Sequence, residues 1–275
     1  MLRWIPFGVA VAIVRALLLL MPQRLTRFAD INLQLAFPNL GSNQRRKIIG
    51  GMWLSLARLI ATAARFPRMK RENIQRWIRY DGFEHFEAAR ARGSGVLFAT
   101  GHLGNWELSA FAHGLMSRPM GIVVRPLDNP RLDEFVTRMR SLSGNRVLDR
   151  RGFIRPLLQM LKENEAAGIL VDQNVLLNEG IFVPFFGVPA CVDATFAKLA
   201  ARTGATVIPG FAVWDDAERR YILKFYPPVP ITGDTVADTA RIHAALEAAI
   251  REHPEQWLWI HRRWKTRPPG EPALY

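Results

Sequence analysis

Cysteine is almost absent from this chain of 275 residues, and some familiar catalytic signatures are missing as well. Cys191 is the single cysteine, which excludes an internal disulfide framework and a cysteine-based zinc site. We expect it to be a small buried side chain. No G-x-S-x-G sequence is present, so the nucleophile elbow of a serine hydrolase is lacking. The chain has no internal repeat and no low-complexity tract, and about half of its residues are apolar. Disorder is therefore not expected, and the length suits one large α/β domain, alone or with an appendage.

Acidic residues are scarce in the first 79 positions. This segment contains 14 lysines and arginines but only Asp30 and Glu72 as acids, so it carries +12 of the net charge of +13. Residues 80–275 are close to neutral. A basic surplus that is confined to one end indicates binding to a polyanionic surface, either nucleic acid or an anionic membrane.

The first apolar segment favours the membrane. Residues 4–21, WIPFGVAVAIVRALLLLM, form an apolar run of 18 residues, near the minimum length for a membrane span. No signal-peptide cleavage sequence follows, and Arg24 and Arg27 outnumber Arg3, which favours a cytoplasmic location for the C-terminal side. Arg15 lies inside the run, where a charge is costly. A helix in the membrane interface and a buried helix of a soluble protein therefore stay open as alternatives.

A second helix is predicted from about residue 43 to Pro67. Its apolar stripe consists of Ile49, Met52, Trp53, Leu56, Leu59, Ile60 and Ala63. Basic residues surround this stripe, as on a helix that lies on an anionic membrane, although a core-facing helix has the same pattern. We therefore predict two parts, residues 1–79 with membrane-associating helices and residues 80–275 with an α/β domain.

Short apolar runs alternate with helix-length segments from about residue 80 onward. The predicted strands are 95–100, 120–125, 146–149, 168–173, 206–214 and 221–226. The predicted helices are 105–117, 130–142, 152–164, 192–203 and 235–252. This alternation predicts an α/β fold with a largely parallel sheet, whose ligands bind at the carboxyl ends of the strands.

A histidine and a glutamate follow the first of these strands, in the sequence GHLGNWE. His102 lies where the strand ends, Gly101 and Gly104 permit a tight turn, and Glu107 falls in the first turn of the next helix. A carboxylate beside an imidazole fixes its tautomer, so His102 is a candidate general base for a hydroxyl that a substrate supplies. A capping histidine with a first-turn acid is the structural alternative. A metal site is not expected, because H-x4-E is not a standard ligand spacing.

The same sequence resembles the H-x4-D/E motif of glycerolipid-type acyltransferases. The wider chain resembles the lysophospholipid acyltransferase family, in the branch that includes the lauroyl and myristoyl acyltransferases of lipid A biosynthesis. Six segments carry this resemblance in the family's order: GHLGNWE (101–107), NRVLDRRG (145–152), GILVDQN (168–174), FVPFFGVPA (182–190), LAARTGATVIP (199–209) and PEQWLWIHRRWKTRP (254–268). Each segment alone is weak evidence, but together they cover nearly the whole chain.

The resemblance implies a mostly parallel central sheet flanked by helices and a membrane-associated O-acyltransferase. Such an enzyme moves a fatty acyl chain from a thioester of acyl carrier protein or coenzyme A to a hydroxyl of a lipid, such as a lipid A precursor, without a cofactor. His102 and Glu107 are then the catalytic residues, with Arg150, rather than Arg151, expected to bind phosphate or the lipid head group. The expected substrate-binding residues are Asn105, Arg125, Arg150, Arg151, Asp172 and Gln173. The expected location is the inner membrane, with the catalytic domain on its cytoplasmic face.

Several alternatives stay open at this point. The acceptor can be another glycolipid or phospholipid, such as a phosphatidylinositol mannoside, and water can replace it in a thioesterase or lipid hydrolase. A non-catalytic binder of anionic lipid or nucleic acid is the third hypothesis. FVPFFGVPA suits either the wall of an acyl tunnel or a core loop. Trp257, Trp259 and Trp264 alternate with basic residues, which suits a membrane interface or a phosphorylated head group, and no nucleic-acid motif accompanies them.

Overall fold

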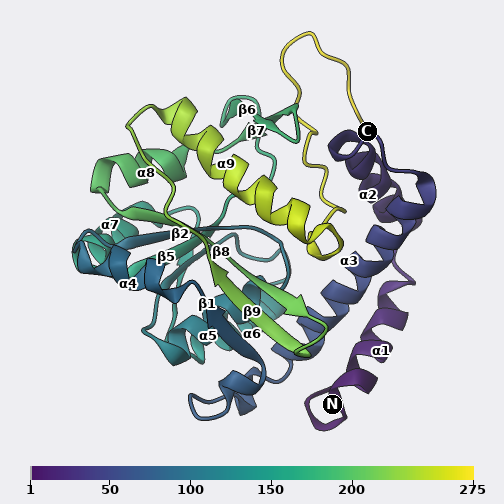
Figure 1. The fold of residues 1–275 in the computed structure, drawn as a ribbon, viewed down its shortest axis with the longest axis horizontal. Coiled ribbons are helices and arrows are strands. Elements are labelled where there is room, and N and C mark those ends of the chain that lie inside the picture. Colours follow the sequence, from purple (N-terminus) through teal and green to yellow (C-terminus); the bar gives the residue numbers. More distant parts are fainter. Residues whose placement is uncertain (1) are drawn as a thin grey trace.

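A seven-stranded sheet crosses the centre of the computed structural model, which describes residues 2–275, and helices cover both of its faces (Figure 1). The strand order is β1-β9-β8-β2-β5-β3-β4. The strands are β1 (Ile78–Asp81), β2 (Val96–Thr100), β3 (Gly121–Val124), β4 (Arg146–Asp149), β5 (Ala166–Leu170), β8 (Thr206–Asp215) and β9 (Arg220–Phe225). Every neighbouring pair is parallel except β8 and β9, which form an antiparallel hairpin. The predicted α/β class with a largely parallel sheet is confirmed.

The alternating side chains of β2 divide the core between the two faces. Val96 and Phe98 belong to the apolar cluster beneath α4 (Phe83–Ala91), α5 (Trp106–Met116) and α6 (Pro130–Ser141). Leu97 and Ala99 belong to the cluster beneath α7 (Ile154–Lys162), α8 (Thr195–Thr203) and α9 (Thr235–Glu252). A parallel strand that is covered on both faces is apolar throughout, which explains the continuous run that the sequence shows here.

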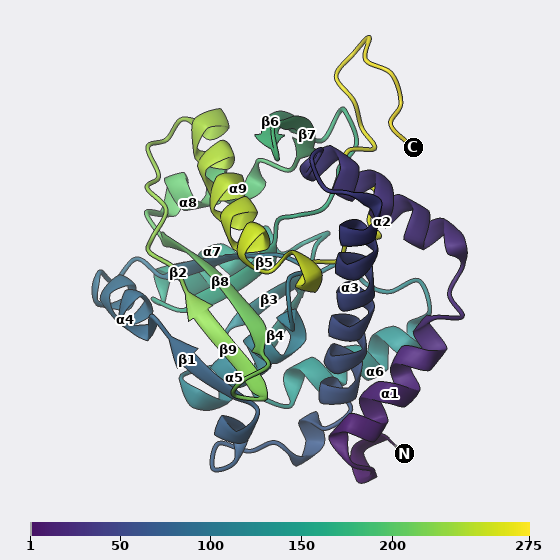
Figure 2. The ribbon, with the colours of Figure 1, turned by 45° about the vertical axis from the view of Figure 1, so that its right-hand side comes forward.

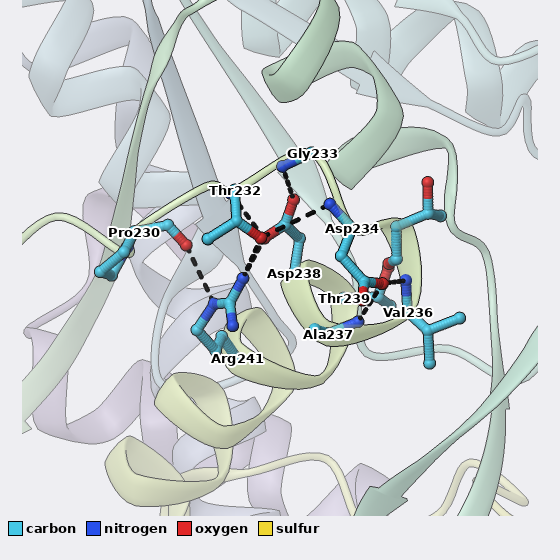
Figure 3. Close-up of polar contacts among 10 residues, drawn as sticks. Pro230, Thr232, Gly233, Asp234, Val236, Ala237, Asp238, Thr239 and Arg241 are labelled. Atoms are coloured by element: carbon cyan, nitrogen blue, oxygen red, sulfur yellow. Dashed lines mark hydrogen bonds and ion pairs between the residues drawn. The ribbon is translucent and has the colours of Figure 1, made fainter.

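The start of α9 is fixed by two aspartates (Figure 3). Asp234 caps the helix by accepting hydrogen bonds from the backbone N–H groups of Val236 and Ala237. Asp238 is fully buried and accepts from the N–H groups of Thr232 and Gly233, and it also pairs with a guanidinium one turn further along α9. Satisfying this buried carboxylate anchors α9 across the sheet, where it covers β2 and β8.

Helix α2 (Gln23–Ala36) and two parts of the fold after it were not predicted from the sequence. One is the pair β1 and α4, which precedes β2. The other is a two-stranded antiparallel ribbon, β6 (Ile181–Phe185) and β7 (Val188–Val192), in the segment expected to be an apolar loop. Pro184 and Pro189 face each other in this ribbon. Proline is tolerated there because each strand of a two-stranded ribbon has a free edge that needs no N–H donor.

Three helices precede the sheet: α1 (Phe7–Leu18), α2 (Gln23–Ala36) and α3 (Ser42–Ala63). Pro6 and Pro22 precede α1 and α2, so the apolar run expected over residues 4–21 becomes a helix of 12 residues. Such a helix is about 18 Å long, against about 30 Å for the apolar layer of a bilayer. In residues 2–275 no helix has by itself the length and apolar character of a membrane span; α1 and α2 meet that test only as a pair, bent by 96°.

Helix α1 buries one side and exposes the other. Ala10, Val11 and Val14 pack against α3, which lies beside it (Figures 1 and 2). Another side leaves the large apolar side chains of Val9, Ile13 and Leu17 in solvent, and Leu19 and Leu20 are exposed in the turn that follows the helix. An exposed apolar face of this size indicates an interaction surface.

The stripe on α3 faces the protein core. Ile49, Met52 and Trp53 belong to the same buried cluster as Trp257, Trp259 and Trp264. Those three tryptophans are at most 1% exposed, so the expectation that they lie at a membrane interface is wrong. In residues 257–264 aromatic and basic residues alternate because the tryptophans fill the space between α3, β6 and β7.

Candidate active site

His102 lies in the loop between β2 and α5, at the carboxyl edge of the sheet. Gly104 has a φ of +64°, and a Cβ at this position would overlap the carbonyl oxygen of Ala212, so only glycine fits. The N–H of Asn105 donates to that same carbonyl over 2.8 Å, and its side-chain oxygen caps α5 by accepting from the N–H of Leu108. The loop is thus fastened to β8 on one side and to α5 on the other.

The carboxylate that contacts the imidazole belongs to Asp172, just beyond the end of β5. Because β5 neighbours β2 in the sheet, the His102 and Asp172 side chains meet, with Nδ1 lying 2.8 Å from Oδ1. The other carboxylate oxygen accepts from the backbone N–H of His102 at 2.7 Å and from the indole N–H of Trp257 at 2.9 Å. A carboxylate only accepts, so Nδ1 carries the proton and Nε2 is left with its lone pair.

Burial and charge act in opposite directions on this pair. Burial alone lowers the pKa of His102. The charge of Asp172 and the hydrogen bond that the ring donates to it outweigh this effect, and Glu107 adds a smaller attraction, so the pKa is raised. Burial alone raises the pKa of Asp172, yet its contacts with His102 and Trp257 hold it well below the ordinary range. Asp172 therefore stays ionised and stabilises the protonated imidazole.

The expected contact between His102 and Glu107 is corrected by this geometry. Both carboxylate oxygens of Glu107 accept hydrogen bonds from Arg140 on α6, at 2.9 and 2.5 Å. Each of these two side chains is less than one-fifth exposed. Glu107 faces the site but holds a guanidinium rather than the imidazole, so the ring is oriented by Asp172 instead.

The free side of the imidazole opens into a cleft of about 360 Å³. Three of the predicted substrate-binding residues line it: Arg125, Arg150 and Gln173. Arg150 makes one long contact with Asp193, at 3.4 Å, and nearly half of its side chain is exposed. Arg125 pairs with the fully solvated Asp128. Both guanidinium groups are thus available to an anionic ligand in the cleft.

The other three predicted substrate-binding residues do not line the cleft. Asn105 is fully buried beneath the loop and acts as a helix cap. Asp172 is 3% exposed and is covered by the ring that it orients. Arg151 points to solvent, and its N–H donates to Asp149 in the turn after β4. In this structure the three residues are a helix cap, an orienting carboxylate and a surface residue, and their binding of substrate stays a prediction.

A narrow apolar cavity lies beside the cleft, between α5 and the sheet. Its wall is formed mainly by Phe98, Met120, Ile122, Leu170, Leu223 and Phe225. Gly168 and Gly210 leave space on the sheet side, and Trp106, Glu107 and Arg140 stand at the end nearest to His102. His113 also lines the cavity, and burial lowers its pKa to about 3, so this ring is neutral. The cavity therefore suits an uncharged, flexible chain.

Sequence reasoning missed two groups in the site. Arg140 lines both the cleft and the cavity, and Trp106 stacks edge-on against the His102 ring, with centroids 4.8 Å apart. Trp106 lies within the motif GHLGNWE, so its position beside His102 in the sequence was a signal that could have identified it. Arg140 carries no local signal, because it lies on a separate helix 33 residues from Glu107. No group of three or more His, Cys, Asp or Glu side chains placed to hold a metal ion occurs in residues 2–275.

Known proteins share this sequence over most of its length. The sequence model of the family described as bacterial lipid A biosynthesis acyltransferase matches residues 1–266. The chain is 30% identical to the lipid A biosynthesis lauroyltransferase of Escherichia coli K12 over 92% of its length and 83% of that protein. It is similar to the palmitoleoyltransferase (29% identity, 92% and 83% of the two chains) and the myristoyltransferase (26%, 90% and 78%) of lipid A biosynthesis from the same strain.

Proposed function

Since the chain belongs to the bacterial lipid A biosynthesis acyltransferase family and is an acyltransferase, we propose that it moves a fatty acyl chain from a thioester to a hydroxyl of a lipid A precursor. The donor in this proposal is the fatty acyl thioester of acyl carrier protein or of coenzyme A. The observation that carries it is the imidazole of His102, whose Nδ1 is held by Asp172 while Nε2 faces a cleft lined by arginines.

The reaction needs one proton transfer in each direction. Nε2 of His102 takes the proton of the acceptor hydroxyl as that oxygen attacks the thioester carbonyl carbon. The carbonyl oxygen carries the negative charge of the tetrahedral intermediate. When the C–S bond breaks, the departing sulfur takes the proton back from the imidazolium. Asp172 keeps the ring in the productive tautomer and stabilises its charge between the two steps.

Arg140 is proposed to stabilise the negative charge that develops at the reaction centre. It lines both the cleft and the cavity, and Glu107 holds its guanidinium through two hydrogen bonds. A donor group that is fixed in advance loses little entropy when the charge appears, so it lowers the barrier effectively. This gives Glu107 a positioning role through Arg140.

The two hollows divide the substrates between them. The apolar cavity, of about 50 Å³, suits a few methylenes of the acyl chain, since burial of each methylene contributes about 0.8 kcal/mol. The cleft suits the head group of a phosphorylated acceptor, because Arg125 and Arg150 present planar donor forks that match phosphate. The two hollows share Trp106 and Arg140 in their linings, and His102 lines the cleft with its ring against Trp106.

The acceptor is a lipid, so we place the reaction at the cytoplasmic surface of the inner membrane. The exposed apolar face of α1 supports this placement, because single large apolar side chains are common on protein surfaces but a continuous face is not. In this proposal α1 lies in the interface, and its 12 residues need not span the bilayer.

The test is an assay of the purified chain with a lipid A precursor and a series of acyl thioesters, analysed by mass spectrometry. The expected product is the precursor with one additional acyl chain, and a folded His102→Ala variant should form about 10²–10⁴-fold less of it. Equal activity of the two proteins would remove the proposed role of the imidazole. Release of free fatty acid without acylated lipid would assign the chain to hydrolysis instead.

A further inference from the structure

Another pocket, of about 420 Å³, lies at the start of α1. It shares no residue with the cleft or the apolar cavity. It is formed where α1 meets the segment after α3 and the tip of the β8–β9 hairpin. Six arginines line it: Arg3, Arg65, Arg68, Arg76, Arg219 and Arg220. Its lining includes no aspartate or glutamate.

The charge of this pocket is left largely uncompensated within residues 2–275. Arg220 is the one member of the set with an ion pair, to Glu218. Arg65 is only 6% exposed, and its hydrogen-bond acceptors are neutral. Its guanidinium donates to the backbone carbonyls of Ala61 and Ile5, at 2.6 and 2.7 Å. A buried charge without a counter-charge is costly, so a bound anion here would relieve an existing penalty.

Two acids near the hairpin tip are already paired. Asp216, at the hairpin tip, pairs with Arg58, and Glu218 pairs with both Arg79 and Arg220. Within residues 2–275, the pocket arginines other than Arg220 therefore have no carboxylate partner and can hold an anion from outside the chain. A phosphate suits them, since it accepts the paired hydrogen bonds that an arginine fork offers.

The surroundings of the pocket are those of a membrane interface. Trp4 is 67% exposed, and the guanidinium groups of Arg3 and Arg68 lie over its ring at 5.3 and 4.7 Å. Phe7, the first residue of α1, packs against Trp77 and Trp214 in the pocket wall. The exposed apolar face of α1 begins directly beyond, at Val9. Tryptophan and arginine beside an apolar face match the depth at which lipid head groups lie.

We propose that this arginine pocket binds the phosphate of an anionic phospholipid head group while the exposed face of α1 enters the acyl region of the same leaflet. The site extends the proposed membrane association of α1 and rests on it, but it is separate from the catalytic cleft. An apolar face continuous with the pocket favours a lipid over a nucleic acid or a soluble phosphate.

This site also fixes the direction in which the cleft faces. Strand β8 pairs with β2 up to Pro209, opposite Ala99, and then continues to Asp215 and the hairpin tip. Arg219 and Arg220 are therefore carried about 20 Å beyond the end of that pairing, on the same edge that bears His102. A lipid held at the hairpin tip and at α1 turns this edge toward the membrane that contains the acceptor.

The experiment compares two triple variants of the full chain with equal charge loss. The pocket variant is Arg68→Gln/Arg76→Gln/Arg219→Gln. The matched control is Arg15→Gln/Arg24→Gln/Arg27→Gln, which removes exposed arginines of α1 and α2 that lie outside the pocket. Binding is measured by sedimentation with vesicles of phosphatidylcholine, alone or with phosphatidylglycerol.

At low salt both variants bind the anionic vesicles more weakly, since each arginine near such a surface contributes about fivefold to binding. At about 1 M salt the Debye length is ~3 Å, so diffuse attraction is screened while direct hydrogen bonds to phosphate persist. The control then binds like the unchanged chain, and the pocket variant stays at least about tenfold weaker. Equal binding of the two variants at high salt would overturn the site.

Two further arms separate this site from its alternatives. Soluble glycerol phosphate that bound as tightly in calorimetry as the vesicle lipid would overturn the lipid assignment in favour of a soluble ligand. Acyl transfer in neutral detergent micelles should be the same for the pocket variant and the unchanged chain. Absence of transfer in both would contradict the proposed function and leave the vesicle result as an independent test of the pocket.

Discussion

His102 and Asp172 are 70 residues apart in the chain, and their side chains meet at 2.8 Å. The contact exists because β2 and β5 are neighbours in the sheet and both end at the same edge. Trp257 and the backbone N–H of His102 occupy the second carboxylate oxygen, so the carboxylate cannot rotate away. One nitrogen of the imidazole is thus fixed, and the other faces the cleft, where the amide of Gln173 lies 3.5 Å away and a substrate hydroxyl can replace it.

The first prediction concerns this pair. Asp172→Asn removes the attraction that raises the pKa of His102 and leaves the burial that lowers it, so the pKa falls. The base must be neutral to accept a proton, and the acidic limb of the transfer rate follows its pKa. We expect that limb to move to lower pH, while the plateau rate falls about 10²-fold or more because the imidazolium loses its stabilising charge.

The matched control is Asp128→Asn, which removes a carboxylate that lines the same cleft but is almost fully exposed and pairs with Arg125. Its acidic limb should stay where it is in the unchanged chain. A pH–rate profile of Asp172→Asn that matched this control would show that the carboxylate does not set the basicity of the ring.

Glu107 and Arg140 give a second prediction with opposite signs. Glu107 raises and Arg140 lowers the pKa of His102. Glu107→Gln should therefore move the acidic limb to lower pH, and Arg140→Gln should move it to higher pH. The double variant should lie between the two single variants, since the two charges act in opposite directions. Arg140→Gln should also slow transfer by about 10²-fold if the guanidinium stabilises the developing oxyanion.

The rates of these variants should not be additive. Glu107 acts by holding Arg140, so Glu107→Gln added to Arg140→Gln should cost little more than Arg140→Gln alone. Additive losses in kcat/KM would instead mean that Glu107 touches the reaction independently, as the sequence motif suggested. The measurement is a double-mutant cycle at the pH optimum of each protein.

Local pattern accounts for what the sequence predicted well. The run at 95–100 is apolar because β2 is covered on both faces, and the helix after Asn105 begins where its side chain caps it. Pro6 and Pro22 bound α1, and with them the 18-residue run becomes a 12-residue helix. Those prolines were visible in the sequence, but the continuous hydropathy outweighed them in the prediction.

Long-range pairing explains what the sequence could not give. The chain order of the strands does not reveal that β5 lies beside β2, so Asp172 was identified as a cleft residue but not as the partner of His102. Glu107 is only five residues from His102, which favours a contact between the two in a reading of the sequence. In the structure Glu107 instead accepts hydrogen bonds from Arg140 on another helix. The tryptophans of 257–264 were misplaced for the same reason, because α3 packs on them from the other end of the chain.

Arg150 gives a third prediction, which separates acceptor binding from chemistry. Its guanidinium lines the cleft and makes one weak contact, so Arg150→Ala should not disturb the fold. A charged hydrogen bond to a phosphate contributes about 1.5–3 kcal/mol, so the KM for a phosphorylated acceptor should rise about tenfold or more. Acceptor-free hydrolysis of the acyl thioester should change much less, and Arg150→Lys should recover transfer only in part.

Arg151→Ala is the control for Arg150, since Arg151 is adjacent in sequence but does not line the cleft. Transfer and hydrolysis are measured in the same preparations of all four proteins. If Arg150→Ala lost both reactions equally, the residue would serve the donor or the fold, and if it lost neither, its guanidinium would be an ordinary surface group.

The last prediction concerns the length of the acyl chain. Gly168 pairs with Phe98 in β2, so it lies about 13 Å before His102 along the strand direction and near the deep end of the apolar cavity. A Cβ at this position would lie 2.9 Å from the terminal methyl of Met120, a flexible side-chain end that can move aside. Gly168→Ala should therefore fold normally and shorten the cavity by about one or two methylenes. Each excluded methylene costs about 0.8 kcal/mol, or roughly fourfold in the preference between neighbouring chain lengths.

The assay for this prediction offers a mixture of acyl thioesters from decanoyl to hexadecanoyl, and mass spectrometry identifies the lipid products. Gly152→Ala, whose added Cβ meets no atom within 4 Å, is the control and should keep the original preference. An unchanged product distribution in a folded Gly168→Ala protein would place the acyl chain outside this cavity, because no chain that fills it can ignore a new methyl group in its wall.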